Sequence, residues 1–264
     1  MSKNILLTIQ YDGTDFHGWQ KQPQARTVQG EIEHVLRYIA GEEIVIHGTS
    51  RTDAGVHALG QCASFTWDNP LPTEKLPLIM NRRFGTEGLG RSGAPGDIRI
   101  LSAKEMPEEF HARYSCVGKT YLYRICRGGD LWKRNQVFRY PEELDTDRMR
   151  EAAKHIVGTL DFKCFETAGG TPRETTVRTI TELTVEQPEP EGEILIRVTG
   201  DGFLYKMVRI IVGTLCEAGT GRRDPAEIPE VIASRDRSRA GFTAPPQGLY
   251  LEQIYFDSLP GVKQ

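Results

Sequence analysis

The chain has 264 residues, which is enough for one large domain or two small ones and for a sizeable hydrophobic core. Its formal net charge is −3, which by itself argues against a nucleic-acid-binding protein, and 26% of its residues are charged. No apolar run approaches the roughly 20 residues that span a membrane, and the start of the chain lacks the long apolar core of a signal peptide, so we expect a cytoplasmic protein.

The first part of the chain predicts the order strand, helix, strand, strand, helix, strand. Alternating apolar residues start a strand that ends at the turn Tyr11-Asp12-Gly13, and Thr27 can cap a helix that Gly41 stops. This order is that of the ferredoxin-like split unit. Residues 85–94 carry four glycines without apolar periodicity and predict a mobile loop. The expected strands are 5–10, 44–47, 58–67 and 97–103, and the expected helices are 28–40 and 76–83.

The second part repeats the plan roughly. Asp145 can cap a helix that Gly158 closes, and residues 203–218 predict a strongly apolar helix. The other expected elements are strands at 110–127, 176–186, 193–199 and 249–256 and a short helix at 227–233. We therefore predict an α+β protein with two ferredoxin/RRM-like halves, 1–107 and 108–264. Their mainly antiparallel sheets would join, with helices on one face and a central cleft as the ligand site.

The cysteines and histidines do not predict a metal centre. Five cysteines occur without a CxxC pair, and six histidines occur without metal-ligand spacing, so buried free thiols are the simplest interpretation. A phosphate-binding P-loop is also missing from the sequence, which argues against a nucleotidase or kinase. We expect no metal and no small-molecule cofactor.

Reactive groups concentrate between two predicted strands, in the run Ser50-Arg51-Thr52-Asp53-Ala54-Gly55-Val56-His57. Asp beside Gly is often only a turn residue. Arg51 can instead hold the Asp53 carboxylate ionised, and an ionised, positioned carboxylate can act as a covalent nucleophile. His57 adds another polar group to the loop, so both interpretations of Asp53 stay open from the residues alone.

Two further segments place polar groups inside apolar patterns. Tyr121, in Lys119-Thr120-Tyr121-Leu122-Tyr123, is by alternation a core strand residue. Arg209 lies among apolar residues of the helix predicted at 203–218, and a buried guanidinium needs a partner. Basic residues cluster around Arg113 and Lys206 while acid concentrates elsewhere, so a basic face can hold a polyanion although the chain is slightly acidic.

These segments resemble the TruA family of tRNA pseudouridine synthases. The family's catalytic loop, Gly-Arg-Thr-Asp-Ala-Gly-Val-His, differs here only at Ser50. Four more segments in family order complete the resemblance: Tyr11-Asp12-Gly13-Thr14-Asp15-Phe16-His17-Gly18-Trp19-Gln20, Phe110-His111-Ala112-Arg113-Tyr114-Ser115 with the following Lys119-Thr120-Tyr121, Phe203 to Gly213, and Ala244 to Leu251.

The resemblance implies an isomerase that converts uridine to pseudouridine in the anticodon stem-loop of tRNA, at positions 38, 39 and 40, without a cofactor and as a homodimer. It implies that Asp53 attacks the sugar C1′ or the base C6, or triggers deprotonation at C2′. It also implies that Tyr121 stacks on the flipped base and moves a proton, and that Arg209 pairs with Asp53. Substrate contacts are expected from Arg51, His57, Arg113, Lys119 and Lys206.

Two departures and two alternatives remain. If the position of Ser50 needs a positive φ, the loop is shifted, and the insertion at 85–94 splits a segment that the family usually keeps together. The alternatives are an RRM-like protein that binds RNA without changing it, and a carboxylate-dependent hydrolase. The first lacks an RNP1-type run in this sequence, and the second would consume water whereas an isomerase does not.

Overall fold

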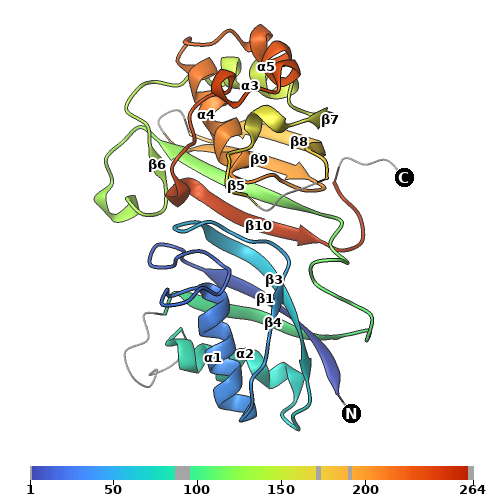
Figure 1. Ribbon diagram of the computed structural model, residues 1–264. Coiled ribbons are helices and arrows are strands. Elements are labelled where there is room, and N and C mark those ends of the chain that lie inside the picture. The colour runs from blue at the N-terminus through green and yellow to red at the C-terminus, as the bar shows by residue number, and fades with distance from the viewer. Residues whose placement is uncertain (1, 87–95, 171–173, 190–191, 261–264) are drawn as a thin grey trace. The chain divides into compact units, whose positions relative to one another are not determined.

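The computed structural model describes residues 2–86, 96–170, 174–189 and 192–260 (Figure 1). It is a mixed α/β structure with five α-helices in the described part of the chain. The residues group into two compact units, Met1–Cys116 with Leu251–Phe256, and Val117–Tyr250 with Asp257–Gln264. No helix within the described ranges has the length and apolar character needed to cross a bilayer. All five cysteines are free thiols as predicted, but only Cys62, Cys164 and Cys216 are buried, whereas Cys116 and Cys126 are partly exposed.

The first unit is an antiparallel sheet with β1 at its centre. Strand β1 pairs with β3 on one side and with β4 on the other, while β2 pairs with β3. Helices α1 and α2 lie side by side on one face of this sheet (Figure 1). The elements are β1 (Lys3–Tyr11), α1 (Val28–Ala40), β2 (His47–Gly48), β3 (His57–Trp67), α2 (Leu76–Phe84), β4 (Ile98–Met106) and most of β10 (Leu249–Tyr255).

Local signals explain the first helix of this unit. The Thr27 hydroxyl accepts a hydrogen bond from Gly30 N–H, and Gly41 ends the helix in the left-handed conformation at φ 80°. The buried side of β1 consists of Ile5, Leu7 and Ile9, each with no exposed surface. The predicted cap, stop and strand alternation are therefore confirmed.

The second unit is built around strands in the order β5-β9-β8-β7, all antiparallel, with β6 parallel to β5. Helix α3 packs against α4 and β8, and Asp145 caps α3 as predicted by accepting hydrogen bonds from Asp147 N–H and Arg148 N–H. The elements are β5 (Gly118–Cys126), β6 (Phe138–Arg139), α3 (Thr146–Lys154), β7 (Gly158–Asp161), β8 (Val177–Glu186), β9 (Ile194–Gly200), α4 (Met207–Gly219) and α5 (Ile228–Ser234).

Four local predictions need correction. Residues 110–117 are not part of a strand, because a turn forms at 112–114, where Tyr114 N–H and Ser115 N–H both donate to the backbone oxygen of His111. The second strand covers only His47–Gly48. Helix α4 begins at Met207 because Lys206 before it is left-handed, with φ 59°. Gly158 begins β7 instead of closing α3.

Two other predictions have no test. Residues 87–95, which hold most of the predicted mobile loop, lie outside the described residues. The division into halves at 1–107 and 108–264 also stays a prediction, beside the two compact units that the structure shows.

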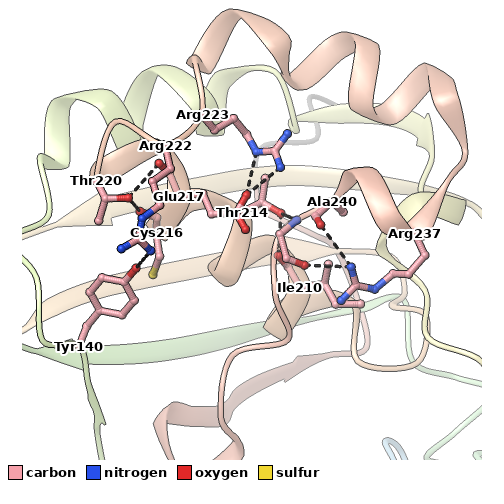
Figure 2. A network of polar contacts seen from close by, with 11 residues as sticks. Tyr140, Ile210, Thr214, Cys216, Glu217, Thr220, Arg222, Arg223, Arg237 and Ala240 are labelled. Carbon is pink, nitrogen blue, oxygen red and sulfur yellow. Dashed lines mark hydrogen bonds and ion pairs between the residues drawn. The ribbon is translucent and has the colours of Figure 1, made fainter.

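Polar contacts fasten helix α4 to the segment that follows α5 (Figure 2). The Thr214 hydroxyl donates to Ile210 O at 2.9 Å and accepts from Gly241 N–H at 2.9 Å. Arg237 donates to Gly241 O at 2.9 Å. A Cβ at Gly213 would lie only 1.9 Å from the backbone oxygen of Phe242, so this crossing needs glycine in the helix.

We expect Gly213→Ala to lower the free energy of unfolding by about 1–3 kcal/mol. The added methyl group collides with backbone atoms, which cannot rotate out of the way as a side chain can. Gly128→Ala is the matched control: nothing lies within 4 Å of a Cβ there, so its effect should stay within about 0.5 kcal/mol. Urea denaturation of both variants measures the difference. Equal unfolding midpoints would contradict the close crossing.

Candidate active site

Asp53 lies on a tight turn that leads into β3. Its backbone oxygen accepts a hydrogen bond from Val56 N–H at 3.2 Å, and Gly55 between them has a φ of 77°. Thr52 and Val56 are buried, Asp53 is half-buried, and Ala54 is exposed. The turn is therefore anchored by its neighbours while the aspartate itself reaches the surface.

The segment after β1 holds this turn by backbone and side-chain hydrogen bonds. Trp19 N–H donates to Thr52 O at 3.1 Å, and Gly55 N–H donates to Phe16 O at 3.3 Å. The hydroxyls of Tyr11 and Thr52 share a buried hydrogen bond of 2.8 Å. The opening motif, Tyr11 to Gln20, and the loop from Ser50 to His57 therefore form one structure around Asp53.

Two glycines let these segments approach each other. A Cβ at Gly13 would lie 2.0 Å from Val56 O, and one at Gly18, which has a φ of 87°, would lie 2.6 Å from Thr52 O. Because both neighbours are backbone atoms, no side-chain rotation can relieve the clash. The glycines of the opening motif are therefore required by contact with the Asp53 turn.

Gln61 lies on β3, and its side chain holds Ser50, which precedes the Asp53 turn. Its side-chain amide donates to Ser50 O at 2.7 Å, and its side-chain oxygen accepts from Ser50 N–H at 3.3 Å. Ser50 does not need a positive φ, because the non-glycine residues with positive φ in the described chain are Gln24, Lys206 and Arg235. The substitution of the family's glycine by Ser50 is thus compatible with an undistorted loop.

His57 is buried behind the turn and faces Asp12. Its Nδ1 accepts a hydrogen bond from Gly13 N–H at 3.0 Å and lies 3.2 Å from an oxygen of Asp12. One nitrogen cannot accept from Gly13 and donate to Asp12 at once, so the two contacts belong to different proton positions on the ring. The hydrogen bond from His57 and the bonds from Thr14 outweigh burial and lower the pKa of Asp12 well below its usual range. These contacts support the loop, and the predicted contact of His57 with substrate stays a prediction.

Arg113 lies on the turn after residue 110 and is exposed. Its neighbour Ala112 is held on both sides: the backbone N–H donates to Ser64 Oγ at 3.0 Å, and the backbone oxygen accepts from the Thr49 hydroxyl at 3.1 Å. Thr49 precedes the Asp53 turn by four residues in the chain. The Arg113 turn is therefore fixed to β3 through Ser64 and, through Thr49, to the segment that leads to Asp53.

Lys119 and Tyr121 belong to the second unit, on β5. Tyr121 is 7% exposed and pairs with Val198 of β9. Its ring meets Phe203 edge to face, with 5.1 Å between ring centroids and an interplanar angle of 87°. Packing on Phe203 fixes the direction of the phenol ring.

Lys206 and Arg209 lie at the start of α4. Lys206 has a left-handed backbone, which is uncommon for a residue with a long side chain, and its ammonium lies 4.9 Å from the ring centre of Tyr205. Arg209 Nε donates to Ala244 O at 2.7 Å, and Ala244 N–H donates to Arg209 O at 3.0 Å. Arg209 is thereby tied to the segment that follows α5, which also packs closely against helix α4 at Gly213.

Among the predicted site residues, the structure places Arg51, Asp53, His57 and Arg113 in the first unit and the other four in the second. Sequence reasoning assigned no role to four residues that hold the Asp53 turn: Tyr11, Asp12, Thr52 and Gln61. The signal for the first two was their place in the opening motif, and no spacing rule pointed to Gln61. Within the described residues, no group of three histidine, cysteine or carboxylate side chains is arranged to hold a metal ion.

Comparison with known proteins gives consistent matches. A family model described as tRNA pseudouridine synthase matches residues 7–115 and 152–257. The chain is 43% identical over 257 residues to tRNA pseudouridine synthase A 2 of Clostridium perfringens, covering 96% of this chain and all of that protein. It is 45% identical over 256 residues to tRNA pseudouridine synthase A of Ruminiclostridium cellulolyticum, again with 96% and 100% coverage.

A solved structure, the archaeal box H/ACA sRNP Nop10-Cbf5 complex, aligns with 81% of this chain and 43% of that chain. The sequence identity is 11% and the TM-score is 0.36, so this similarity is too distant to indicate a shared function. The family model covers more than half of the chain, and the relatives match it over nearly its whole length. The chain belongs to the tRNA pseudouridine synthase family.

Proposed function

We propose that this chain isomerises uridine to pseudouridine in the anticodon stem-loop of tRNA, at positions 38, 39 and 40, with Asp53 as the nucleophile. The observation that carries the proposal is the half-buried carboxylate of Asp53 on a turn whose backbone is held by Trp19 and Phe16. Family membership supports the reaction, because the matched residues include both the turn and the segment that holds it.

The reaction asks little of the protein beyond position and charge. The N-glycosidic bond between N1 and C1′ breaks, the uracil turns in place, C5 bonds to C1′, C5 loses a proton and N1 gains one, so substrate and product are isomers and no water is consumed. A carboxylate held at the reacting centre supplies the nucleophile. A base inside a stem must first be flipped out, at about a few kcal/mol. A fixed turn is suited to this task because the nucleophile must stay in place while the base rotates.

Residues of the second unit complete the proposal. Tyr121 would stack on the flipped base, and Arg209 would pair with Asp53. The orientation of Tyr121 by Phe203 and of Arg209 by Ala244 supports these roles. The exposed cations Arg51 and Arg113, with Lys119 and Lys206, would contact RNA phosphates. Tyr121 and Lys119 fall between the two segments that the family model matches, so their roles depend more on the full-length relatives.

The finer fold and the assembly are also part of the proposal. The chain order of the first six elements, with β1 between β3 and β4, supports a ferredoxin-like first half. The joined sheets, the central cleft, the homodimer and the cytoplasmic location stay predictions from the sequence.

We expect Asp53→Asn to bind unmodified tRNA transcripts with unchanged affinity and to form no pseudouridine, because the amide keeps the shape of the side chain and loses its nucleophilic charge. Mapping pseudouridine by position in the transcripts measures this. Asp68→Asn is the matched control, since Asp68 is an exposed aspartate that follows β3 whereas Asp53 precedes it. Product formed by the Asp53 variant would rule out the assigned role.

The hydrogen bond between Thr52 and Tyr11 positions the turn, so Thr52→Val should lower kcat about 2- to 12-fold with little change in KM, as expected for one buried hydrogen bond. Thr52→Ser keeps the hydroxyl and should restore most of the lost rate. Steady-state kinetics on a tRNA transcript separate the two constants. If both variants lose thermal stability equally and keep kcat, Thr52 is only a structural residue.

The lowered pKa of Asp12 predicts a pH-dependent contribution to stability. The ionised carboxylate stabilises the folded state above the ordinary aspartate pKa of about 4, and this contribution is lost as pH falls from there through the lowered pKa. Asp12→Asn should therefore reduce the melting temperature at pH 7, and the difference from the unsubstituted protein should shrink below about pH 4. In a His57→Gln background the difference at pH 7 should become smaller. A difference that is constant from pH 7 to pH 3 would disprove the linkage.

A further inference from the structure

Three rings form a row on the surface of the first unit. The His47 and His111 rings are 4.9 Å apart between centroids, and the His111 and Tyr114 rings are 4.4 Å apart. The interplanar angles are 33° and 35°, so neighbouring rings are in contact and tilted relative to each other. Tyr114 is 78% exposed, which leaves its ring open to a further stacking partner. We call these three residues the ring row.

The ring row is held by hydrogen bonds to the strands on either side of the Asp53 turn. His47 belongs to β2, which pairs with β3 at Ser64. The turn that carries His111 and Tyr114 is fixed through Ala112, which bonds Ser64 and Thr49. Strand β2 continues through Thr49 directly to the Asp53 turn, so both features rest on the same pair of strands.

The chemistry of the ring row suits a nucleobase better than a protein partner. Its rings are a phenol and two imidazoles, which offer flat faces with polar edges. Burial is the largest cause that lowers the pKa of His111 below its ordinary value. The Arg113 guanidinium lies 5.9 Å from the Tyr114 ring centre, where it can meet the phosphate of a stacked nucleotide.

We propose that the ring row is a second RNA contact, in which an unpaired base of the tRNA substrate stacks on Tyr114 while Arg113 contacts the adjoining phosphate. This proposal rests on the proposed function, and it adds a binding site outside the catalytic turn. Stacking on an aromatic side chain accepts any base, so the ring row contributes affinity without selecting a sequence.

The test is binding of an unmodified tRNA transcript at several salt concentrations to the full chain and its variants. Tyr114→Ala should weaken binding by about 5- to 140-fold, the range for one stacked base, while the dependence on salt stays unchanged. Tyr114→Phe should bind like the unsubstituted protein. Arg113→Ala should weaken binding and reduce the slope of log affinity against log salt by about one, as expected for one lost phosphate contact.

Tyr38→Ala is the matched control for the loss of an exposed tyrosine. Tyr38 is 62% exposed, and its ring lies 3.6 Å from the Arg83 guanidinium, so it resembles the pair of Tyr114 and Arg113 but belongs to helix α1. Its removal should leave tRNA affinity within twofold. Melting temperatures of all variants show that they fold.

Three outcomes would overturn the proposal. Affinity of Tyr114→Ala within twofold of the unsubstituted protein excludes stacking. Equal loss in Tyr114→Phe and Tyr114→Ala assigns the effect to the hydroxyl. A smaller sedimenting mass of Tyr114→Ala with unchanged RNA affinity shows that the ring row contacts a second copy of this chain. Pseudouridine formation by the unsubstituted protein is measured in parallel, so failure of the proposed function is seen separately.

Discussion

The hydrogen bond from Trp19 N–H to Thr52 O is the contact on which the candidate active site depends. It joins two stretches of backbone, so its geometry is set by main-chain atoms and cannot adapt through rotamers. Gly18 next to it allows the approach, since any Cβ there would lie 2.6 Å from the same Thr52 oxygen. A catalytic carboxylate on a loop keeps its position only if the loop is fixed by contacts of this kind. The buried Tyr11 hydroxyl and the Gln61 amide then fix the two residues on either side of Arg51.

The elements that could be predicted are those whose causes are local. Thr27 and Asp145 cap helices through bonds to the next turn of backbone, and alternation in β1 follows from burial on one face. The turns at 110–117 could not be predicted in this way. They precede a segment whose alternation is typical of a strand and were included in the same prediction, but Ala112 is held by Ser64 and Thr49, which are 48 and 63 residues away in the chain. Contacts at that separation leave no periodic signal in the sequence.

The candidate site shows the same division. Asp53 was recognisable because arginine, aspartate, glycine and histidine occur together in one short run. The role of Tyr11 was not recognisable, because its partner Thr52 is 41 residues away. His57 illustrates a different difficulty. A histidine beside a reactive residue suggests contact with substrate, yet this ring is 2% exposed and faces Asp12 and Gly13. Residue type indicated a polar function, the structure shows polar contacts with Asp12 and Gly13, and contact with substrate stays a prediction.

Net charge was a poor guide because many carboxylates are engaged within the protein. Glu193 is held by Arg124 at 2.7 Å and by Lys133 at 3.0 Å, and Glu33 is held by Lys21 at 2.9 Å. Each such pair adds nothing to the formal net charge and little to the field at a distance, so the sum does not show where the exposed cations lie. An exposed cation beside an aromatic ring, such as Arg113 beside Tyr114, acts differently because it combines charge with a stacking surface. Under our proposal, RNA recognition by a slightly acidic chain depends on where such combinations lie, and one of them is fixed to β3 through Ser64 and to the segment before Asp53 through Thr49.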